Sequence, residues 1–283
     1  MKTTGWIGLG NMGTPMAANL LKAGYKVNIY LRDPSKQSPL LSDGANGLAE
    51  LNNFIEQTDV IFLTLPNDSI TEDTFTRILS TNISGKTFIN SSTISPGLAQ
   101  KLHHAVSVKE GIYIDAPVSG SVKPAIDGTL SFLVGGEQQA YTENIPFFEI
   151  MGKHHYYLGQ AGSGSKAKLA INYYMSVVVQ GLAETVLFAE ENGISREMMT
   201  AIVNDGACGS GMSKIKTAPI LKDEYPAAFP LKFMLKDLRL AQAEGWNTDL
   251  INAAEKMFNK ASEQGLAEQD LMAVIKAIKE QLN

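Results

Sequence analysis

Short apolar runs alternate with stretches of helical periodicity over the first half of the chain. The pattern predicts strands at residues 4–9, 26–31, 59–65, 87–91 and 112–116, and helices at 12–23, 48–57, 70–79 and 97–108. The run 59–65 (DVIFLTL) is apolar on both faces, which is typical of a parallel strand covered by helices on each side. This alternation predicts a doubly wound α/β domain. Two further strand-like pieces, 130–134 and 155–158, are expected to close it.

The second half of the chain has a different pattern. After Gly162-Ser163-Gly164, residues 165–192 keep apolar positions at helical spacing without a proline. A helix of that length extends roughly 42 Å. The remaining residues are also helical in pattern, apart from the glycine-rich stretch 206–211 and the segment 219–230. We therefore predict an N-terminal domain of residues 1–162 and an all-helical C-terminal domain of residues 163–283, joined by the long helix.

Composition excludes several classes of protein. Hydrophobic residues make up 44% of the chain, charged residues make up 19%, the net charge is −5 and the pI is about 5.5. No overall attraction to nucleic acid or anionic lipid follows from such a charge, and no run reaches the roughly 18 apolar residues of a membrane helix. A soluble, cytoplasmic protein is expected. Cys208 is the single cysteine, and the histidines form two adjacent pairs at 103–104 and 154–155, so no metal site is predicted.

A glycine motif marks a nucleotide site. Gly8, Gly10 and Gly13, with Asn11 and Met12 between them, form GxGxxG directly after the first predicted strand and open the first helix. In that setting the first glycine permits a tight turn, the second admits a pyrophosphate, and the third allows the helix to pack closely on the strand. The phosphates are expected at the helix N-terminus, where free N–H groups favour negative charge. A purely structural turn with three coincidental glycines is the alternative.

The end of the second predicted strand bears on the choice of dinucleotide. NAD sites usually place a carboxylate there for the ribose 2′-hydroxyl, whereas NADP sites offer an arginine to the 2′-phosphate. Here the strand ends in Tyr30-Leu31, and Arg32 and Lys36 follow. We therefore expect NADP(H). Asp33, 20 residues past Gly13, is the counter-argument, although it comes after the arginine and directly before a proline.

Five motifs together resemble one family, the β-hydroxyacid dehydrogenases. The segment DAPVSGSVKPAIDGTL at 115–130 resembles the family's substrate-binding signature, and Gly162-x-Gly164 followed by Lys168 and Asn172 resembles its catalytic motif. The other three are the glycine loop, the segment STISP at 92–96, and the segment FPLKFMLKDL at 229–238. They occur in the family's order and spacing over the whole chain.

The resemblance implies roles for further residues. Leu65, Pro66, Asn67, Thr93 and Lys236 correspond to cofactor contacts, and Phe229 and Asp237 to positions at the substrate pocket. Some positions depart from the common family pattern: Ser121 replaces a glycine, Ile171 replaces the first of two asparagines, and Leu31 replaces an asparagine after the second strand. Ser121, Lys123-Pro124 and Asn172 resemble the glyoxylate/succinic semialdehyde reductase branch, which uses NADPH. For the assembly we expect a homo-oligomer, either a dimer or a tetramer.

Lys168 has the properties of a general acid. Reduction of an aldehyde by hydride needs a proton donor at the carbonyl oxygen. The position of Lys168 near the positive end of a helix dipole favours its neutral amine and is expected to lower its pKa. Asn172 lies one turn further on the same face, where its amide is expected to orient Lys168 or the substrate. A solvated surface lysine is the alternative.

A carboxylate on the substrate needs an anion-binding loop. Ser119-Gly120-Ser121 offers hydroxyl and backbone N–H groups, and Pro124 is expected at the first position of a short helix whose N-terminus points at the ligand. Lys123 either adds charge there or lies in solvent. Phe229 is expected either to shield the reacting groups or to pack in the core.

Taken together, these residues predict NADPH-dependent reduction of a small carboxylate-bearing aldehyde. Two other functions are the alternatives. One is an NAD-dependent 3-hydroxyisobutyrate-type dehydrogenase that works in the oxidative direction. The other is a non-catalytic dinucleotide-binding module, against which the presence of Lys168 and Asn172 argues.

Overall fold

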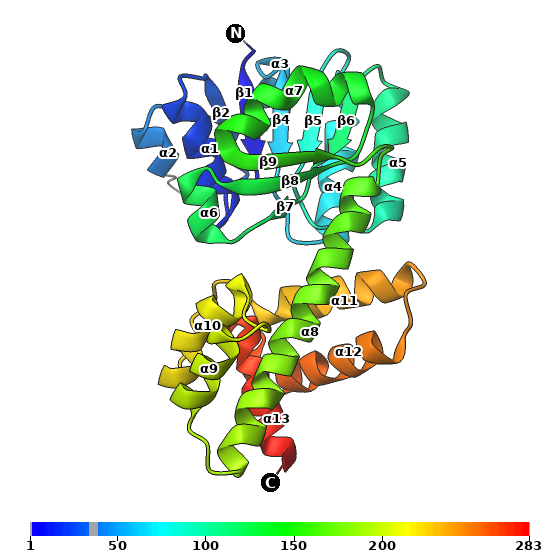
Figure 1. Ribbon diagram of the computed structural model, residues 1–283. Coiled ribbons are helices and arrows are strands. Elements are labelled where there is room, and N and C mark those ends of the chain that lie inside the picture. The colour runs from blue at the N-terminus through cyan, green and yellow to red at the C-terminus, as the bar shows by residue number, and fades with distance from the viewer. Residues whose placement is uncertain (1, 34–38, 283) are drawn as a thin grey trace. The chain divides into compact units, whose positions relative to one another are not determined.

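The computed structural model describes residues 2–33 and 39–282 (Figure 1). The chain divides into two compact units, Met1–Lys168 (unit 1) and Leu169–Asn283 (unit 2). The division falls inside the long helix α8 (Ser163–Glu191). The boundary that we predicted between residues 162 and 163 stays a prediction.

A six-stranded parallel sheet forms the centre of unit 1. Its strands are β1 (Thr4–Ile7), β2 (Val27–Tyr30), β3 (Asn46–Leu48), β4 (Val60–Leu63), β5 (Thr87–Asn90) and β6 (Ile112–Asp115). They lie in the order β3-β2-β1-β4-β5-β6 and every pair is parallel. This is the order of a Rossmann sheet, so the predicted doubly wound α/β fold is confirmed.

Helices bury both faces of this sheet. In β4, Val60 and Phe62 belong to a core with α1 (Gly13–Lys22) and α7 (Gln138–Met151). Ile61 and Leu63 belong to a second core with α3 (Leu51–Glu56), α4 (Asp68–Ile78) and α5 (Pro96–Ser107). The alternation of strand side chains explains why the apolar run DVIFLTL has no polar face.

Unit 1 also contains a second, smaller sheet. Strands β7 (Val118–Ser119), β8 (Leu130–Val134) and β9 (Gly152–Tyr157) pair with one another in that order, antiparallel and then parallel. The pieces 130–134 and 155–158, which we expected to close the domain, are strands of this separate sheet, and the second of them begins earlier, at Gly152. In Figure 1 this sheet lies with α7 on one side of the main sheet.

Other elements in unit 1 were missed or misplaced. The predicted helix 48–57 begins only at Leu51, because Leu48 pairs with Tyr30 as the end of β3. Helix α7 was not predicted, and it contains Pro146, a residue that usually ends a helix. The helices α2 (Pro39–Ser42) and α6 (Val122–Asp127) are too short to show a helical period.

Unit 2 is helical, as the sequence predicted. Its helices after α8 are α9 (Arg196–Asp205), α10 (Gly211–Lys222), α11 (Leu231–Ala243), α12 (Asp249–Ala261), the short η1 (Ser262–Leu266) and η2 (Leu271–Ala273), and α13 (Val274–Leu282). They share one hydrophobic core, to which α8 contributes Val179, Ala183 and Val186. A buried ion pair joins α10 to the segment before η2, with 2.7 Å between Lys216 Nζ and Asp270 Oδ1.

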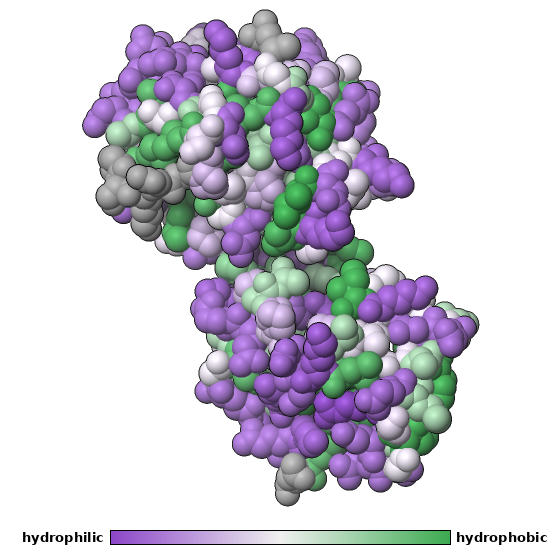
Figure 2. All heavy atoms as spheres, turned by 90° about the vertical axis from the view of Figure 1, so that its left-hand side faces the viewer, coloured by the Kyte–Doolittle hydropathy of each residue, from purple (hydrophilic) through white to green (hydrophobic). Residues whose placement is uncertain are grey.

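The face of each unit that Figure 2 draws is mainly polar. On the faces drawn in Figure 2, hydrophilic residues predominate in each unit, and hydrophobic residues form smaller patches between them. Among the described residues, no helix is both long enough and apolar enough to cross a membrane. Even the 29-residue helix α8 is amphipathic, with exposed and buried positions alternating along it.

Candidate active site

The glycine loop between β1 and α1 has a backbone that side chains would disrupt. Gly8 has φ +96°, and a Cβ there would lie 2.2 Å from the carbonyl oxygen of Thr64. A Cβ at Gly13 would lie 2.2 Å from the carbonyl oxygen of Gly8. The first and third glycines of GxGxxG thus permit a tight turn and close helix packing, for the reasons that the motif suggests.

The space around the loop fits a dinucleotide. A Cβ at Gly10 would meet nothing within 4 Å, so the backbone is open to a ligand at this position. Met12 occupies the N-cap position of α1 and its side chain forms no capping hydrogen bond. In the first turn the Thr14 N–H donates to the Gly10 carbonyl oxygen at 3.1 Å and Pro15 has no N–H, so the candidates to bind a pyrophosphate are the N–H groups of Asn11, Met12 and Gly13.

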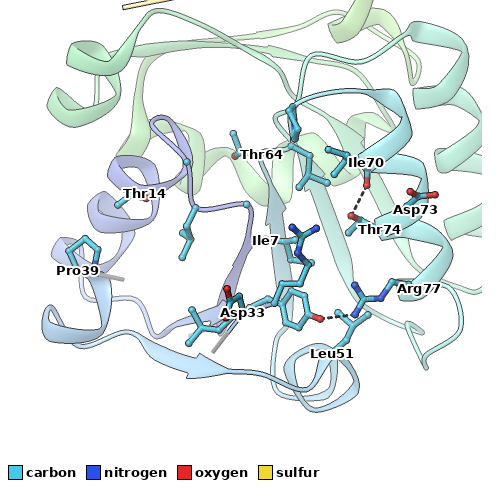
Figure 3. A pocket seen from close by; sticks show the side chains of 18 residues that line it. Ile7, Thr14, Asp33, Pro39, Leu51, Thr64, Ile70, Asp73, Thr74 and Arg77 are labelled. Carbon is cyan, nitrogen blue, oxygen red and sulfur yellow. Dashed lines mark hydrogen bonds between the residues drawn. The ribbon is translucent and has the colours of Figure 1, made fainter. Parts of the chain in front are cut away.

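A cavity of about 610 Å³ opens beside this loop at the carboxyl ends of β1, β2 and β4 (Figure 3). Arg32 and Asp33 line it from the end of β2, and Leu65 and Pro66 line it after β4, together with Gly8 and Gly10. The crevice at the carboxyl ends of the strands is where ligands bind in open α/β sheets. Lys36, which we also predicted to contact the cofactor, lies outside the described residues.

A second arginine, which sequence reasoning missed, also lines this cavity. Arg77 lies near the end of α4, and its Nη2 donates a hydrogen bond of 2.7 Å to the hydroxyl of Tyr30. Figure 3 draws this bond as a dashed line from Arg77. Tyr30 is the last residue of β2 and lies 47 positions earlier in the sequence. A sequence pattern contains no sign of such a pairing.

The loops after β4 and β5 are held together by side-chain hydrogen bonds. The Leu65 N–H donates to Ser92 Oγ at 2.8 Å. Asn67 accepts a 2.9 Å hydrogen bond from the Ile70 N–H and so caps α4 with its side-chain oxygen. Thr93 is half-buried in the loop between β5 and α5. Asn67 thus has a structural task, and its predicted cofactor contact, like that of Thr93, stays a prediction.

Lys168 lies in the second turn of α8 and is only 8% exposed. A surface lysine normally extends into water, so this burial argues against the surface alternative. The start of α8 is fixed by a carboxylate from the main sheet. Asp115, the last residue of β6, accepts two hydrogen bonds. The Gly162 N–H donates to Oδ1 at 2.8 Å, and the Ser165 N–H donates to Oδ2 at 2.9 Å.

Asp115 is itself almost fully buried. Desolvation raises the pKa of its carboxyl above the ordinary value, and the hydrogen bonds from the Gly162 and Ser165 N–H groups oppose that rise. The close packing around Asp115 leaves no room for a side chain at two neighbouring glycines. A Cβ at Gly135 would lie 2.6 Å from Asp115 Oδ1, and one at Gly164 would lie 2.2 Å from the carbonyl oxygen of Leu133. Asp115 therefore sets the position at which the helix with Lys168 begins.

The predicted carboxylate-binding segment lies between β7 and α6. Ser119 ends β7, Gly120 has φ +131°, and Ser121 is the N-cap residue of α6 without a capping hydrogen bond from its side chain. One detail was wrong. Helix α6 begins at Val122, so Pro124 is its third residue rather than its first, and the segment turns two residues earlier than we predicted.

Lys123 is directed into solvent. Its side chain is 83% exposed, and its Nζ lies 2.7 Å from Asp127 Oδ2 one turn further along α6. This geometry favours the surface alternative for Lys123 over a role at the substrate. The hydroxyls of Ser119 and Ser121, both half-buried, remain the candidates for contact with a substrate carboxylate.

In unit 2, the predicted site residues on α8 and α11 contact one another. Asn172, one turn beyond Lys168 on α8, donates from Nδ2 to Asp237 Oδ2 at 2.5 Å, and both residues are buried. Asp237 Oδ1 lies 3.0 Å from Lys236 Nζ. Because Asp237 is only 2% exposed and already has two partners, its geometry suits the orientation of Asn172 better than direct contact with a substrate.

Phe229 precedes α11 in a segment that Asp270 holds in place. The Phe229 N–H donates to Asp270 Oδ2 at 3.1 Å, and the other oxygen of this carboxylate binds Lys216. The Phe229 ring is half-buried against the core of unit 2. Its predicted contact with substrate stays a prediction.

Comparison with known proteins agrees with the fold. Residues 3–159 match the family model described as the NAD binding domain of 6-phosphogluconate dehydrogenase. Residues 162–278 match the one described as the NAD-binding domain of NADP-dependent 3-hydroxyisobutyrate dehydrogenase. The protein is therefore an NAD(P)-dependent oxidoreductase of the class that acts on hydroxyacids and aldehydes. Within that class, the chain belongs to the β-hydroxyacid dehydrogenase family, of the 3-hydroxyisobutyrate dehydrogenase type.

Individual relatives match nearly the whole chain. Glyoxylate/succinic semialdehyde reductase 1 of Arabidopsis thaliana is 36% identical over 97% of this chain and 98% of its own length. The mitochondrial 3-hydroxyisobutyrate dehydrogenase of Drosophila melanogaster is 31% identical over 99% of this chain and 90% of its own. A solved structure of the Mycobacterium tuberculosis 3-hydroxyisobutyrate dehydrogenase with L-serine matches with a TM-score of 0.87 at 29% identity, covering 98% of this chain and 99% of that one.

Proposed function

We propose that the protein reduces small carboxylate-bearing aldehydes, such as glyoxylate or succinic semialdehyde, to the corresponding hydroxy acids with NADPH. The observation that carries this proposal is the burial of Lys168 at the start of a helix whose N-terminus is held by Asp115. A lysine that is withdrawn from water and set on a fixed helix has the properties of a catalytic proton donor.

In the proposed mechanism Lys168 supplies the proton. The reduced nicotinamide, when it is bound, supplies a hydride to the carbonyl carbon. As negative charge develops on the carbonyl oxygen, Lys168 Nζ donates a proton to it and becomes a neutral amine. Asn172, oriented by Asp237, keeps its amide directed along the same face of α8 as Lys168.

The substrate carboxylate is assigned to Ser119–Ser121. The two serine hydroxyls and the backbone N–H groups around Gly120 offer neutral hydrogen-bond donors to an anion. Gly120 supports this role because its φ of +131° makes a turn that a side chain would strain. The reductase of A. thaliana acts on two aldehydes that bear a carboxylate, according to its name, and this similarity supports the same class of substrate.

The proposed preference for NADP(H) rests on the residues that follow β2. Arg32 lines the cavity directly after the strand, where a 2′-phosphate of the adenosine ribose is bound in Rossmann proteins. Asp33 lines the same cavity, and it is the observation that favours the second candidate, an NAD-dependent 3-hydroxyisobutyrate-type dehydrogenase. A carboxylate in that place would accept a hydrogen bond from a free 2′-hydroxyl.

One experiment separates the two candidates. Initial rates are measured with NADPH and with NADH against glyoxylate and the semialdehydes of succinate, tartronate and methylmalonate, and in reverse with 3-hydroxyisobutyrate and NAD or NADP. The proposal predicts the highest kcat/KM for NADPH with glyoxylate or succinic semialdehyde. The alternative predicts oxidation of 3-hydroxyisobutyrate with NAD as the preferred reaction. Turnover in neither direction with any of these compounds would contradict both.

A further inference from the structure

Arg77 lies at the place where the adenosine end of a dinucleotide is expected. It lines the same cavity as Arg32, but it comes from α4 rather than from the strand end. No part of the family resemblance singled it out, and 45 positions separate the two arginines in the sequence. The cavity therefore holds two guanidinium groups that reach it from different elements.

The direction of the Arg77 side chain is set by a neutral partner. Asp73 lies one turn earlier on α4 and lines the same cavity, which is the spacing of a common helical ion pair. Arg77 instead donates to the Tyr30 hydroxyl at 2.7 Å, with its Cζ 5.8 Å from the centre of the Tyr30 ring. Figure 3 shows the Asp73 carboxylate apart from this bond.

Tyr30 is a fixed anchor. Its ring packs against Phe54 with 5.8 Å between the ring centres, and Phe54 is fully buried. The backbone of Tyr30 is held in β2 by pairing with Leu48 of β3. The Arg77 guanidinium is thus held at the last residue of β2, and Arg32 follows that residue by two positions in the sequence.

The two arginines share their cavity with two carboxylates, those of Asp33 and Asp73. In the part of the chain that the structure describes, neither Arg32 nor Arg77 forms an ion pair with a carboxylate. A guanidinium has five N–H donors in a planar fork, and the hydrogen bond to Tyr30 is donated by Nη2 alone. Two such groups match the several acceptor oxygens of a phosphomonoester dianion.

We propose that Arg77 is a second ligand of the NADPH 2′-phosphate, which it binds together with Arg32, and that Tyr30 is the residue that positions it. The proposal rests on the NADPH dependence proposed above and adds a specificity-determining residue to it. A contact between Arg77 and the adenine ring is the competing role, and the two differ in one respect. A 2′-phosphate ligand matters only for NADPH, whereas an adenine contact matters equally for NADH.

The test measures binding and does not need turnover. Dissociation constants for NADPH, NADH, adenosine 2′,5′-bisphosphate and AMP are determined by calorimetry on the wild type and on Arg77→Gln, Arg77→Lys, Arg32→Gln and Tyr30→Phe. Lys109→Gln, which removes one exposed positive charge from unit 1 away from the cavity, is the matched control for a general loss of charge.

We expect Arg77→Gln to weaken NADPH and adenosine 2′,5′-bisphosphate by at least ~10-fold, the scale of a lost charge-assisted contact. NADH and AMP should stay within about twofold, since they lack the phosphate. Tyr30→Phe should show the same selectivity with a smaller effect, and Lys109→Gln should change neither. Arg77→Lys should restore part of the affinity, because an ammonium keeps the charge without the fork.

Two results would overturn the proposal: equal weakening of NADPH and NADH, which assigns Arg77 to the adenine, or no change for either nucleotide. These results are distinct from failure of the proposed function. A wild type that binds NADPH selectively but reduces no carboxylate-bearing aldehyde refutes the function and leaves the two-arginine site intact. A wild type that prefers NADH contradicts both.

Discussion

The side chain of Asn172 donates to the carboxylate of Asp237 across 2.5 Å, and this bond joins two residues that are 65 positions apart in the sequence. Both residues are buried, so the bond is shielded from competing water. Because one amide hydrogen is committed to Asp237, the orientation of the whole Asn172 amide is fixed. Asp237 therefore acts on the site through Asn172.

Replacing Asp237 should impair catalysis more than cofactor binding. Asp237→Asn removes the charged acceptor, and a hydrogen bond to a charged group contributes about 1.5–3 kcal/mol. We expect kcat for aldehyde reduction to fall by roughly tenfold or more, with the dissociation constant of NADPH nearly unchanged. Glu255→Gln is the control, since Glu255 binds Arg239 at 2.9 Å on the exposed side of α11. Equal losses of kcat in both variants would mean that Asp237 acts only on stability.

The buried carboxyl of Asp115 should give unit 1 a specific dependence on pH. Its folded-state pKa is raised by burial, so protonation favours the folded state. The stabilising contribution is fully present below the ordinary aspartate pKa of about 3.9 and is lost as the pH rises through the raised value. The free energy of unfolding of the wild type minus that of Asp115→Asn should therefore be largest at acid pH and shrink toward neutrality.

Fluorescence isolates this effect. The chain has two tryptophans, the fully buried Trp6 in unit 1 and the exposed Trp246 in unit 2. In a Trp246→Phe background, urea unfolding followed by Trp6 reports on unit 1 alone. A difference between the two proteins that grows with rising pH would contradict the assigned direction of the pKa shift.

Ser119→Ala should discriminate between substrates. If Ser119 binds the substrate carboxylate, its loss should weaken transition-state binding of succinic semialdehyde by roughly 1–3 kcal/mol. Butanal, an aldehyde of the same length without the carboxylate, should be a poor substrate and be affected little by the substitution. The measurement is kcat/KM for both aldehydes with both proteins. Equal losses would show that the serine is structural or contacts the reacting carbonyl.

The sequence predicted the features that depend on local pattern. The parallel strands, the glycine loop and the long helix are encoded in apolar periodicity and in glycines at fixed spacing, and the structure places them within a few residues of expectation. Strand β3 was not predicted because its three residues, with a glycine in the middle, are too few to show a strand period. Helix α7 was not predicted because Pro146 interrupts its helical pattern of apolar residues.

Site residues that depend on distant partners were not predictable in the same way. Arg77 is positioned by its hydrogen bond to Tyr30, and Asp115 holds the start of α8 by accepting a hydrogen bond from Gly162. In each pair the two residues are 47 positions apart in the sequence. The available signals were weak: an arginine on the exposed face of α4, and an acid at the end of a buried strand where ligand-binding groups often lie. Lys123 is the reverse example. The motif made it a candidate for substrate binding, but in the structure its side chain lies in solvent and pairs with Asp127.

The central claim is that Lys168 supplies the proton, and its replacement tests that claim most directly. Lys166, two residues earlier on α8 and exposed, is the matched control. The measurement is kcat for NADPH-dependent reduction of succinic semialdehyde, together with the dissociation constant of NADPH, for Lys168→Ala and Lys166→Ala. The account predicts that Lys168→Ala lowers kcat by at least ~10²-fold, the usual scale for a lost general acid, while NADPH binding and the Lys166→Ala enzyme remain near the wild type. Turnover by Lys168→Ala within a few-fold of the wild type would contradict it.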